Sequence, residues 1–356
     1  MKENIGVAVP LRNAEETLQT LRKLQLVDDE LEPKPNNHEL LIPLRRNLSD
    51  ADNAIVRKHC PDAKLQAGFF SERKRARPRD LLESLHGTIP QNLLRRLPRA
   101  YDIVGDIAII DIPEDLSEFA TAIGRGLLEV NPNARLVLRI SGDVTGPFRT
   151  RKFQIIAGSG STETLHRECS CVFHLDVASV YFNPRLSHER MRIAGQVGMH
   201  ETVIDMFAGV GPYSILIART QVTSRVTAID ANPEAFRYLR ENTFANGVAD
   251  RVTPVLADAR TAVSRSLKGS ATRVIMNLPS EAIKFIDAAA QAVRPDGGII
   301  HFYTFASRSV ALGTIKESVA SDLEQCGRRV VSIPFCRPIR EIAPNRVHVA
   351  IDIEVE

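Results

Sequence analysis

The second half of the chain alternates β-strand and α-helix patterns so regularly that few folds can accommodate it. From about residue 200, short runs rich in Val and Ile, such as ETVIDMF and RVTAIDA, are each followed by an amphipathic helix pattern. This alternation predicts a doubly wound, mostly parallel α/β sheet. The last two strand patterns, RRVVSIPF and RVHVAIDIEV, have no helix between them. They predict an antiparallel hairpin at one edge of the sheet.

Two shorter segments precede this sheet. The first reads as strand, helix and strand, and the second carries strand and helix patterns around YDIVGDIAII. A chain of 356 residues is too long for one average domain. We therefore expect two small α+β domains, residues 1–65 and 66–175, followed by the sheet domain, residues 176–356.

Hydropathy and cysteine content point to a cytoplasmic protein. The N-terminus has no sustained apolar segment, and no run approaches the ~18 apolar residues that span a bilayer. The chain has five cysteines, an odd number, which favours a reduced compartment. Cys169 and Cys171 are the close pair, without a second pair or nearby histidines at zinc spacing. We therefore predict no metal site and no membrane partner.

Local charge is more informative than the net charge of +3. Between Phe69 and Tyr101 lie eight basic residues against three acidic ones. The strip has two interpretations that charge alone leaves open: a solvated linker surface, or a strip that contacts phosphates. The basic residues are Arg73, Lys74, Arg75, Arg77, Arg79, Arg95, Arg96 and Arg99.

Polar groups follow four strand patterns of the predicted sheet. Ligands of open α/β sheets bind beyond the carboxyl ends of the strands. An aspartate alone at such an end is commonly a helix cap, but four polar ends in register indicate one shared crevice. The four ends are Asp205-Met206-Phe207-Ala208-Gly209-Val210-Gly211, Asp230-Ala231-Asn232, Asp258-Ala259 and Asn277-Leu278-Pro279.

The residue types at these ends favour S-adenosylmethionine over NAD. Ser214 stands where the dinucleotide fold has its third glycine. Asp205 suits a cationic amine, Asp230 is placed to accept from ribose hydroxyls, and Asp258 is placed to meet an adenine amino group. No aromatic residue follows Pro279, unlike in enzymes that methylate exocyclic amines of bases. This stretch alone leaves open which atom would be methylated and which group would remove its proton.

These motifs look like those of class I methyltransferases, with their Rossmann-like fold. More narrowly, the chain resembles the archaeal and eukaryotic tRNA (guanine(37)-N1)-methyltransferase family. The similarity lies in VYFNPRLSHER, DMFAGVGPYSILIA and NLPSEA, with further similarity in YDIVGDIAII and the N-terminal strands. It covers essentially the whole chain. The Asn-Pro-Arg run with its Glu-Arg pair is the specific part, whereas the glycine motif is generic.

The resemblance implies methyl transfer from S-adenosylmethionine to N1 of guanine 37. Glu189 then matches the family's general base, and Arg149 matches the arginine that stabilises charge on O6, with Arg151 as an open alternative. Without the resemblance, Glu189 reads as a surface ion pair with Arg185. Asn277 and Pro279 would shape the catalytic pocket. The cofactor-binding residues would be Arg190, Asp205, Phe207, Ala208, Gly209, Gly211, Asp230, Ala231, Asp258, Ala259 and Asn277.

The resemblance also implies tRNA as the partner, contacted at the anticodon loop and, through the N-terminal domain, at the outer corner. Arg73, Lys74, Arg75, Arg77 and Arg185 are the predicted phosphate contacts. We expect a cytoplasmic monomer, and the sequence does not show whether Mg²⁺ is needed.

Other functions stay open at this stage. A bifunctional wyosine-pathway methyltransferase differs only in pocket size, and an aminocarboxypropyl transferase of the same superfamily should lack the N-terminal domain and the Glu189 pattern. A non-catalytic tRNA-binding protein is disfavoured by intact polar residues at all four strand ends. A dehydrogenase is disfavoured by the missing third glycine.

Overall fold

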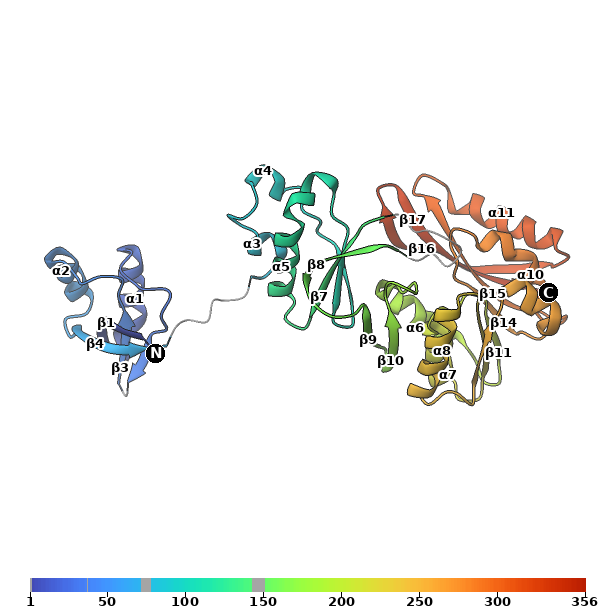
Figure 1. Ribbon diagram of the computed structural model, residues 1–356, viewed down its shortest axis with the longest axis horizontal. Coiled ribbons are helices and arrows are strands. Elements are labelled where there is room, and N and C mark those ends of the chain that lie inside the picture. The colour runs from blue at the N-terminus through green and yellow to red at the C-terminus, as the bar shows by residue number, and fades with distance from the viewer. Residues whose placement is uncertain (1, 37, 72–77, 143–150) are drawn as a thin grey trace. The chain divides into compact units, whose positions relative to one another are not determined.

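A computed structural model of the chain describes residues 2–36, 38–71, 78–142 and 151–356. The chain forms two compact units, Met1–Arg77 and Pro78–Glu356, whose elements are labelled in Figure 1. Five residues with predicted roles lie outside the described residues, and those roles stay predictions. They are Arg73, Lys74, Arg75, Arg77 and Arg149.

The first unit is an antiparallel sheet with two helices packed on one face. The strand order is β2-β3-β1-β4. Val7, Leu21, Ile42 and Val56 are buried together between the sheet and the helices. The elements are β1 (Lys2–Pro10), α1 (Ala14–Lys23), β2 (Lys34–Asn36), β3 (Glu39–Pro43), α2 (Asp50–His59) and β4 (Lys64–Phe70). Strand β4 runs past the predicted boundary at residue 65, and the three-domain division stays a prediction.

The second unit begins with a mixed sheet of strand order β5-β6-β7-β8. Helix α5 crosses over from β6 to β7, which are parallel, and the other strand pairs are antiparallel. Gly105, with φ 57°, forms the tight turn between β5 and β6. The elements are α3 (Leu81–Ser84), α4 (Gln91–Leu94), β5 (Tyr101–Val104), β6 (Ile107–Ile110), α5 (Ala120–Val130), β7 (Leu136–Ile140) and β8 (Phe153–Gly158).

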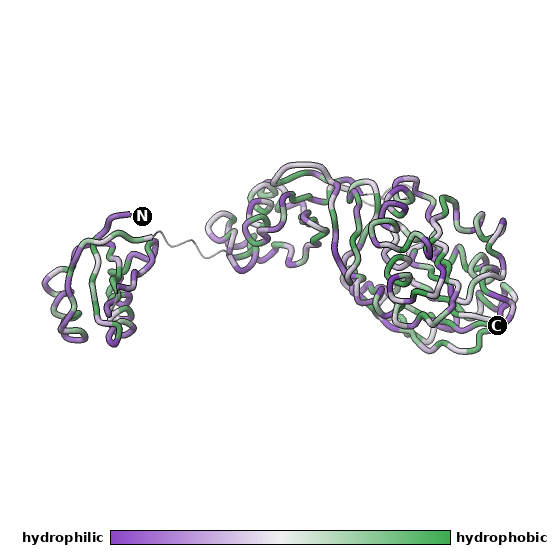
Figure 2. The backbone as a smooth tube through the Cα atoms, turned by 90° about the horizontal axis from the view of Figure 1, so that it is seen from below, coloured by the Kyte–Doolittle hydropathy of each residue, from purple (hydrophilic) through white to green (hydrophobic). Residues whose placement is uncertain are grey.

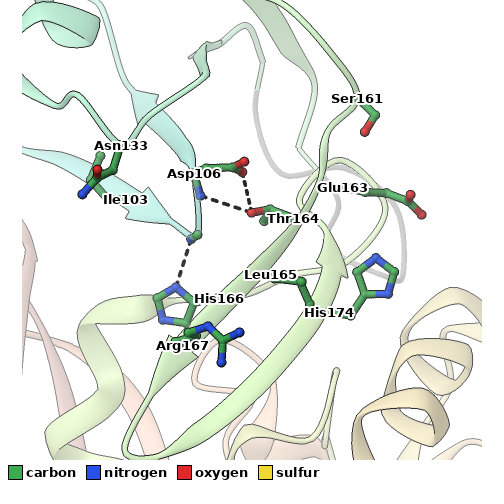
Figure 3. A pocket seen from close by; sticks show the side chains of 11 residues that line it. Ile103, Asp106, Asn133, Ser161, Glu163, Thr164, Leu165, His166, Arg167 and His174 are labelled. Atoms are coloured by element: carbon green, nitrogen blue, oxygen red, sulfur yellow. Dashed lines mark hydrogen bonds between the residues drawn. The ribbon is translucent and has the colours of Figure 1, made fainter. Parts of the chain in front are cut away.

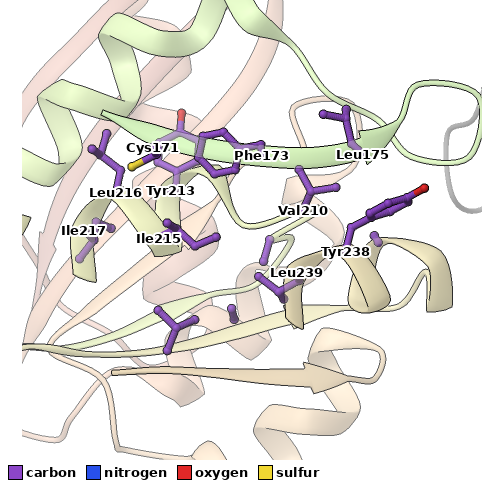
Figure 4. Close-up of a cluster of buried hydrophobic side chains, with 14 of the residues drawn as sticks. Cys171, Phe173, Leu175, Val210, Tyr213, Ile215, Leu216, Ile217, Tyr238 and Leu239 are labelled. Atoms are coloured by element: carbon purple, nitrogen blue, oxygen red, sulfur yellow. The ribbon is translucent and has the colours of Figure 1, made fainter. Parts of the chain in front are cut away.

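A two-stranded hairpin, β9 (Glu163–Glu168) and β10 (Cys171–Asp176), connects this sheet to the larger one. Phe173 and Leu175 of β10 are buried in one hydrophobic core with Val210 and Leu239 of the following domain (Figure 4). Val104 and Leu138 of the mixed sheet belong to the same hydrophobic core. The hairpin therefore packs both parts of the second unit around shared side chains.

The larger sheet has the order β13-β12-β11-β14-β15-β17-β16. Strands β11 to β15 are parallel, whereas β17 pairs antiparallel with both β15 and β16. The structure thus confirms the doubly wound, Rossmann-like sheet with an antiparallel edge hairpin. The strands are β11 (Thr202–Asp205), β12 (Arg225–Asp230), β13 (Val252–Leu256), β14 (Arg273–Met276), β15 (Gly298–Ser307), β16 (Val330–Ala343) and β17 (Arg346–Val355).

Helices cover both faces of this sheet, in two groups. One core joins the first group to one face, and a second core joins the other group to the opposite face. The first group is α6 (Ser187–Gln196), α7 (Pro212–Thr220) and α8 (Pro233–Ala245), and the second is α9 (Ala259–Ala262), α10 (Ile286–Ala292) and α11 (Leu312–Gln325). Strand order reverses between β11 and β14, which is where such sheets bind ligands.

Hydrophobic and hydrophilic residues are distributed as the layered fold requires. Figure 2 shows apolar segments running through the centre of the second unit and polar ones along its outer turns. No helix in the described part of the chain is long and apolar enough to cross a membrane.

Candidate active site

A pocket of about 310 Å³ opens at the carboxyl ends of β11, β12, β13 and β14. Its walls come from these strand ends, from the 181–190 segment and from Phe285. The structure thus brings together the four sequence motifs, which are distributed over residues 205–279. The predicted residues that line the pocket are Arg190, Phe207, Ala208, Gly209, Asp230, Ala231, Asp258, Ala259 and Asn277.

The turn after β11 is shaped by two glycines with different roles. Gly209 has φ 56° and lines the pocket, and its N–H donates to the Asp230 carboxylate at 2.7 Å. Gly211 has φ 93° and does not line the pocket. A Cβ at Gly211 would lie 2.5 Å from Cδ1 of Leu239. The structure gives Gly211 a packing role and places only Gly209 at the pocket.

Asp230 is a half-buried acidic residue that lines this pocket. One of its oxygens accepts from Gly209 and the other from the N–H of Asn232 at 2.9 Å. Asn232 in turn caps α8 by accepting from the N–H of Glu234. Burial raises the pKa of Asp230, against these backbone hydrogen bonds. The carboxylate is thus fixed at the pocket wall, with lone pairs available to accept from hydroxyl groups.

Asp205 lies elsewhere than the sequence suggests. It is fully buried and does not line the pocket, and its contact with a cationic amine stays a prediction. Its Oδ2 accepts from the Ser214 hydroxyl at 2.8 Å, and its Oδ1 has no hydrogen-bond partner among the residues that the structure describes. Burial raises its pKa to about 7, against hydrogen bonds from Ser214 and the Phe207 backbone. Ser214, at the position of the missing third glycine, serves as the partner of this carboxyl group.

Asn277 presents an unsatisfied acceptor at the pocket. Its side-chain oxygen is buried and has no hydrogen-bond partner in the described part of the chain. Such a group costs about 1–3 kcal/mol unless a ligand satisfies it. Pro279 does not line the pocket, but its carbonyl accepts from the N–H of Phe305 at 3.3 Å and ties the loop to β15. The 277–279 loop is therefore held against the sheet with one acceptor reserved for a bound molecule.

Glu189 lies behind the pocket wall. It is buried, and Arg192 donates to both of its oxygens at 2.7 and 2.8 Å. The Tyr303 hydroxyl donates to it at 2.7 Å, and Tyr303 contacts the pocket-lining Tyr213. The alternative interpretation of Glu189, a surface ion pair with Arg185, is wrong, because Glu189 is buried and pairs with Arg192. The Glu189 side chain thus lies one layer of side chains behind the pocket wall.

Arg190 is a wall residue with strong internal partners. It is buried and donates to the Glu168 carboxylate at 2.6 and 2.7 Å and to the Asn183 carbonyl. It also lies over the ring of Phe182. These bonds fix the 181–183 segment at the pocket mouth, and binding of a cofactor carboxylate by Arg190 stays a prediction.

Three arginines gather beside that mouth. Arg185 pairs with Asp102 of β5, and Arg340 donates to the Asn183 side chain at 3.1 Å. Arg151 and Asp102 line a small hollow next to the main pocket. Burial lowers the pKa of Arg340, and the nearby charges of Arg185 and Arg151 lower it further. The mouth thus carries more positive than negative charge, which favours an anionic ligand.

Several pocket residues escaped the sequence reasoning because they are aromatic residues outside the strand-end motifs. Tyr181 and Phe182 precede the Asn-Pro-Arg run, and Tyr213 lies in the first turn of α7. Phe285 packs edge-on against Phe207, with ring centroids 5.0 Å apart. The sequence could have indicated Tyr181 and Phe182, because they directly precede the Asn-Pro-Arg motif. No motif lies next to Phe285 to indicate it.

A larger, more open hollow of about 730 Å³ lies beside β9 (Figure 3). Here the N–H of Gly105 donates to Nδ1 of His166 at 3.1 Å, and the Thr164 hydroxyl donates to Asp106 at 2.7 Å. These bonds join the β5–β6 turn to the hairpin. The hollow is away from the carboxyl ends of β11 to β14, and several of its polar groups bond to one another, which is typical of a structural joint. No cluster of metal-ligating side chains exists among the described residues.

Comparison with known proteins matches three families along the chain. Residues 164–331 match the TRM5/TYW2 methyltransferase domain, residues 81–162 the TYW2 N-terminal domain, and residues 6–52 the tRNA methyltransferase 5 N-terminal domain. The tRNA (guanine(37)-N(1))-methyltransferase Trm5b of Pyrococcus abyssi is 38% identical over 351 residues, 99% of each chain. The tRNA 4-demethylwyosine(37)-methyltransferase Taw21 of Saccharolobus solfataricus is 34% identical, covering 74% of this chain and 99% of Taw21.

Solved structures show the same relationships. The complex of aTrm5 with tRNALeu has a TM-score of 0.74 at 27% identity and covers 99% of this chain and 100% of aTrm5. TYW2 of Methanocaldococcus jannaschii, solved with AdoMet, has a TM-score of 0.56 at 28% identity, covering 72% of this chain and 99% of TYW2.

Proposed function

Because this chain belongs to the TRM5/TYW2 methyltransferase family, we propose that it transfers a methyl group from S-adenosylmethionine to N1 of guanine 37 of tRNA. The observation that carries the proposal is that similarity to Trm5b extends over 99% of both chains and includes the first unit. The pocket at the four strand ends supplies the chemistry that such a reaction needs.

The pocket residues fit S-adenosylmethionine. Asp230 would accept from the ribose hydroxyls, Asp258 from the adenine amino group, and Gly209 would let the backbone approach closely. The unsatisfied oxygen of Asn277 adds an acceptor for a ligand N–H group. When bound, the molecule supplies an electrophilic methyl group on a sulfonium. The protein then has to hold the acceptor nitrogen in line with it, and positioning supplies much of the rate.

Guanine N1 carries a proton at neutral pH, so a base must remove it while O6 gains negative charge. Glu189 is the proposed base, and it would reach the guanine by giving up its bond with Tyr303, past the Tyr213 wall. Arg149 remains the proposed partner of O6. Arg151 is the described alternative, because it lines the hollow that adjoins the mouth.

The charged mouth suits an RNA strand. Guanine 37 would leave its stack to enter the pocket, as nucleotides do in other base-modifying enzymes. Arg185, Arg340 and Arg151 would then contact flanking phosphates, which neutralise their excess charge. A monomer and a cytoplasmic location remain part of the proposal.

The N-terminal unit favours guanine over wyosine intermediates as the substrate. Taw21 of Saccharolobus solfataricus and an aminocarboxypropyltransferase of Methanocaldococcus jannaschii match only 74% and 72% of this chain, although each is matched almost completely. The Trm5b relative of Pyrococcus abyssi matches 99% of this chain, and residues 6–52 of the first unit match the tRNA methyltransferase 5 N-terminal domain.

The test is nucleoside mass spectrometry of a tRNA transcript after incubation with enzyme and labelled S-adenosylmethionine. We expect label in 1-methylguanosine, no label on a transcript with adenosine at position 37, and a much lower rate for Glu189→Ala with cofactor binding retained. Label on both transcripts would refute the assignment of the site. Full activity of Glu189→Ala would remove Glu189 as the base. A tRNA carrying 4-demethylwyosine tests the wyosine alternative in the same assay.

A further inference from the structure

A row of mostly buried charged side chains lies behind Glu189, across one face of the large sheet. Arg192 of α6 donates to both oxygens of Glu189 and to both oxygens of Asp352 on β17. Asp352 also accepts from His301 on β15 at 2.7 Å and from Gln196 at 3.1 Å. One guanidinium is thus shared between two carboxylates, both of which are almost completely buried.

The hydrogen bonds determine where the protons lie in this row of charged side chains. Arg273 can only donate, and it contacts Nε2 of His301 at 2.7 Å, so that nitrogen accepts. Nδ1 of His301 therefore carries the hydrogen and donates to Asp352. Burial lowers the pKa of His301, although Asp352 opposes the change, and the ring is neutral. Arg273 itself pairs with Glu201 and adds no net charge.

The two carboxylates differ in their hydrogen-bond donors: Asp352 accepts from Arg192, His301 and Gln196, whereas Glu189 accepts from Arg192 and Tyr303. Burial raises the pKa of Asp352, but hydrogen bonds from His301 and Arg192 outweigh it and hold the pKa well below its usual range. The cluster of Glu189, Arg192 and Asp352 then carries one net negative charge. A proton taken up by Glu189 neutralises the cluster, and Asp352 remains the ionic partner of Arg192.

We propose that Arg192 and Asp352 are positioning residues that make Glu189 the proton-accepting member of this cluster. The inference rests on the proposed role of Glu189 as the base. Asp352 supplies the extra negative charge that favours proton uptake, and Arg192 holds the Glu189 side chain in place. The other groups that face Glu189 are Tyr303 and, beyond it, Tyr213 and His348.

Removing the negative charge of Asp352 and removing the positive charge of Arg192 should shift the titration of Glu189 in opposite directions. Asp352→Asn leaves Glu189 and Arg192 as a neutral pair, so proton uptake creates a net positive charge and becomes less favourable. Arg192→Gln leaves two carboxylates together, so proton uptake becomes more favourable. We expect the titration midpoint of the Glu189 carboxyl to fall by about one pH unit or more in the first variant and to rise by a similar amount in the second.

The experiment is a carboxyl ¹³C NMR titration of protein labelled at glutamate, with the Glu189 signal assigned from Glu189→Gln. Gln196→Ala is the matched control, because Gln196 contacts Asp352 without carrying charge, and it should leave the midpoint unchanged. Unchanged midpoints in both charge variants, or shifts in the same direction, would overturn the proposal. If Asp352→Asn does not fold, as judged by circular dichroism, Arg192→Gln decides alone: a midpoint that does not rise overturns the proposal.

The pH dependence of single-turnover methyl transfer gives a second readout. The acidic limb should move with the NMR midpoint, downwards for Asp352→Asn and upwards for Arg192→Gln, whereas a merely structural role would lower the rate without moving the limb. The NMR titration needs no RNA. Absence of tRNA methylation by the unmodified chain would therefore refute the proposed function, while the titration still decides the role of the cluster.

Discussion

Replacing Asp205 by Asn tests whether this carboxyl group is a buried structural element or a cofactor ligand. It is fully buried, bonds to Ser214 and does not line the pocket. Burial raises its pKa from 3.8 to about 7. The native state therefore binds one more proton than the unfolded chain between about pH 4 and about pH 7, and stability falls across that window as pH rises.

The size of the effect follows from the pKa. At about 1.4 kcal/mol per unit, a rise from 3.8 to about 7 corresponds to about 4 kcal/mol of lost stability above pH 7. Asparagine stays neutral at every pH, so Asp205→Asn avoids this loss. Its amide nitrogen takes the place of the unpartnered Oδ1, which costs about 1–3 kcal/mol independently of pH. The pH-dependent difference between variant and parent is therefore the diagnostic quantity.

Urea unfolding of both proteins from about pH 4 to about pH 8 measures this difference. We expect the variant to gain roughly 4 kcal/mol relative to the parent across the range, and to bind S-adenosylmethionine within about threefold of the parent by calorimetry. A stability difference that stays constant with pH would mean that Asp205 is charged throughout, which refutes the burial argument. A loss of affinity above about tenfold would restore Asp205 as a cofactor ligand.

Three further changes test separate parts of the site. Asp230→Asn should weaken S-adenosylmethionine binding by about 10- to 100-fold in calorimetry, because a charged acceptor is lost at the pocket wall. Gly211→Ala should lower the free energy of unfolding by about 2 kcal/mol or more, since it combines a left-handed φ with a contact on Leu239; an unchanged urea midpoint would contradict this. Arg340→Ala should reduce the slope of log affinity for tRNA against log salt by about 0.7–0.9, whereas Arg225→Ala, at the amino end of β12, should not.

The sheet and the pocket were predictable because both follow from local patterns. Alternating strand and helix patterns determine a parallel sheet, and parallel strands bring their carboxyl ends to one edge. Asp230, Asp258 and Asn277 were therefore expected near one another, and the structure places all three at the pocket. The side to which Asp205 turns was not predictable, because it depends on Ser214 in the helix that follows.

The surroundings of Glu189 show why the rest could not be predicted. On a helix, Arg185 and Arg192 are both at interacting distance from Glu189, so spacing alone offers two partners. The choice is made by residues distant in sequence: Asp102, 83 residues before Arg185, pairs with that arginine, and Asp352, 160 residues after Arg192, anchors the other. A carboxylate can thus be nominated as a base from its motif. Its capacity to accept a proton depends on which charges the fold buries beside it, and those are decided by packing between distant elements.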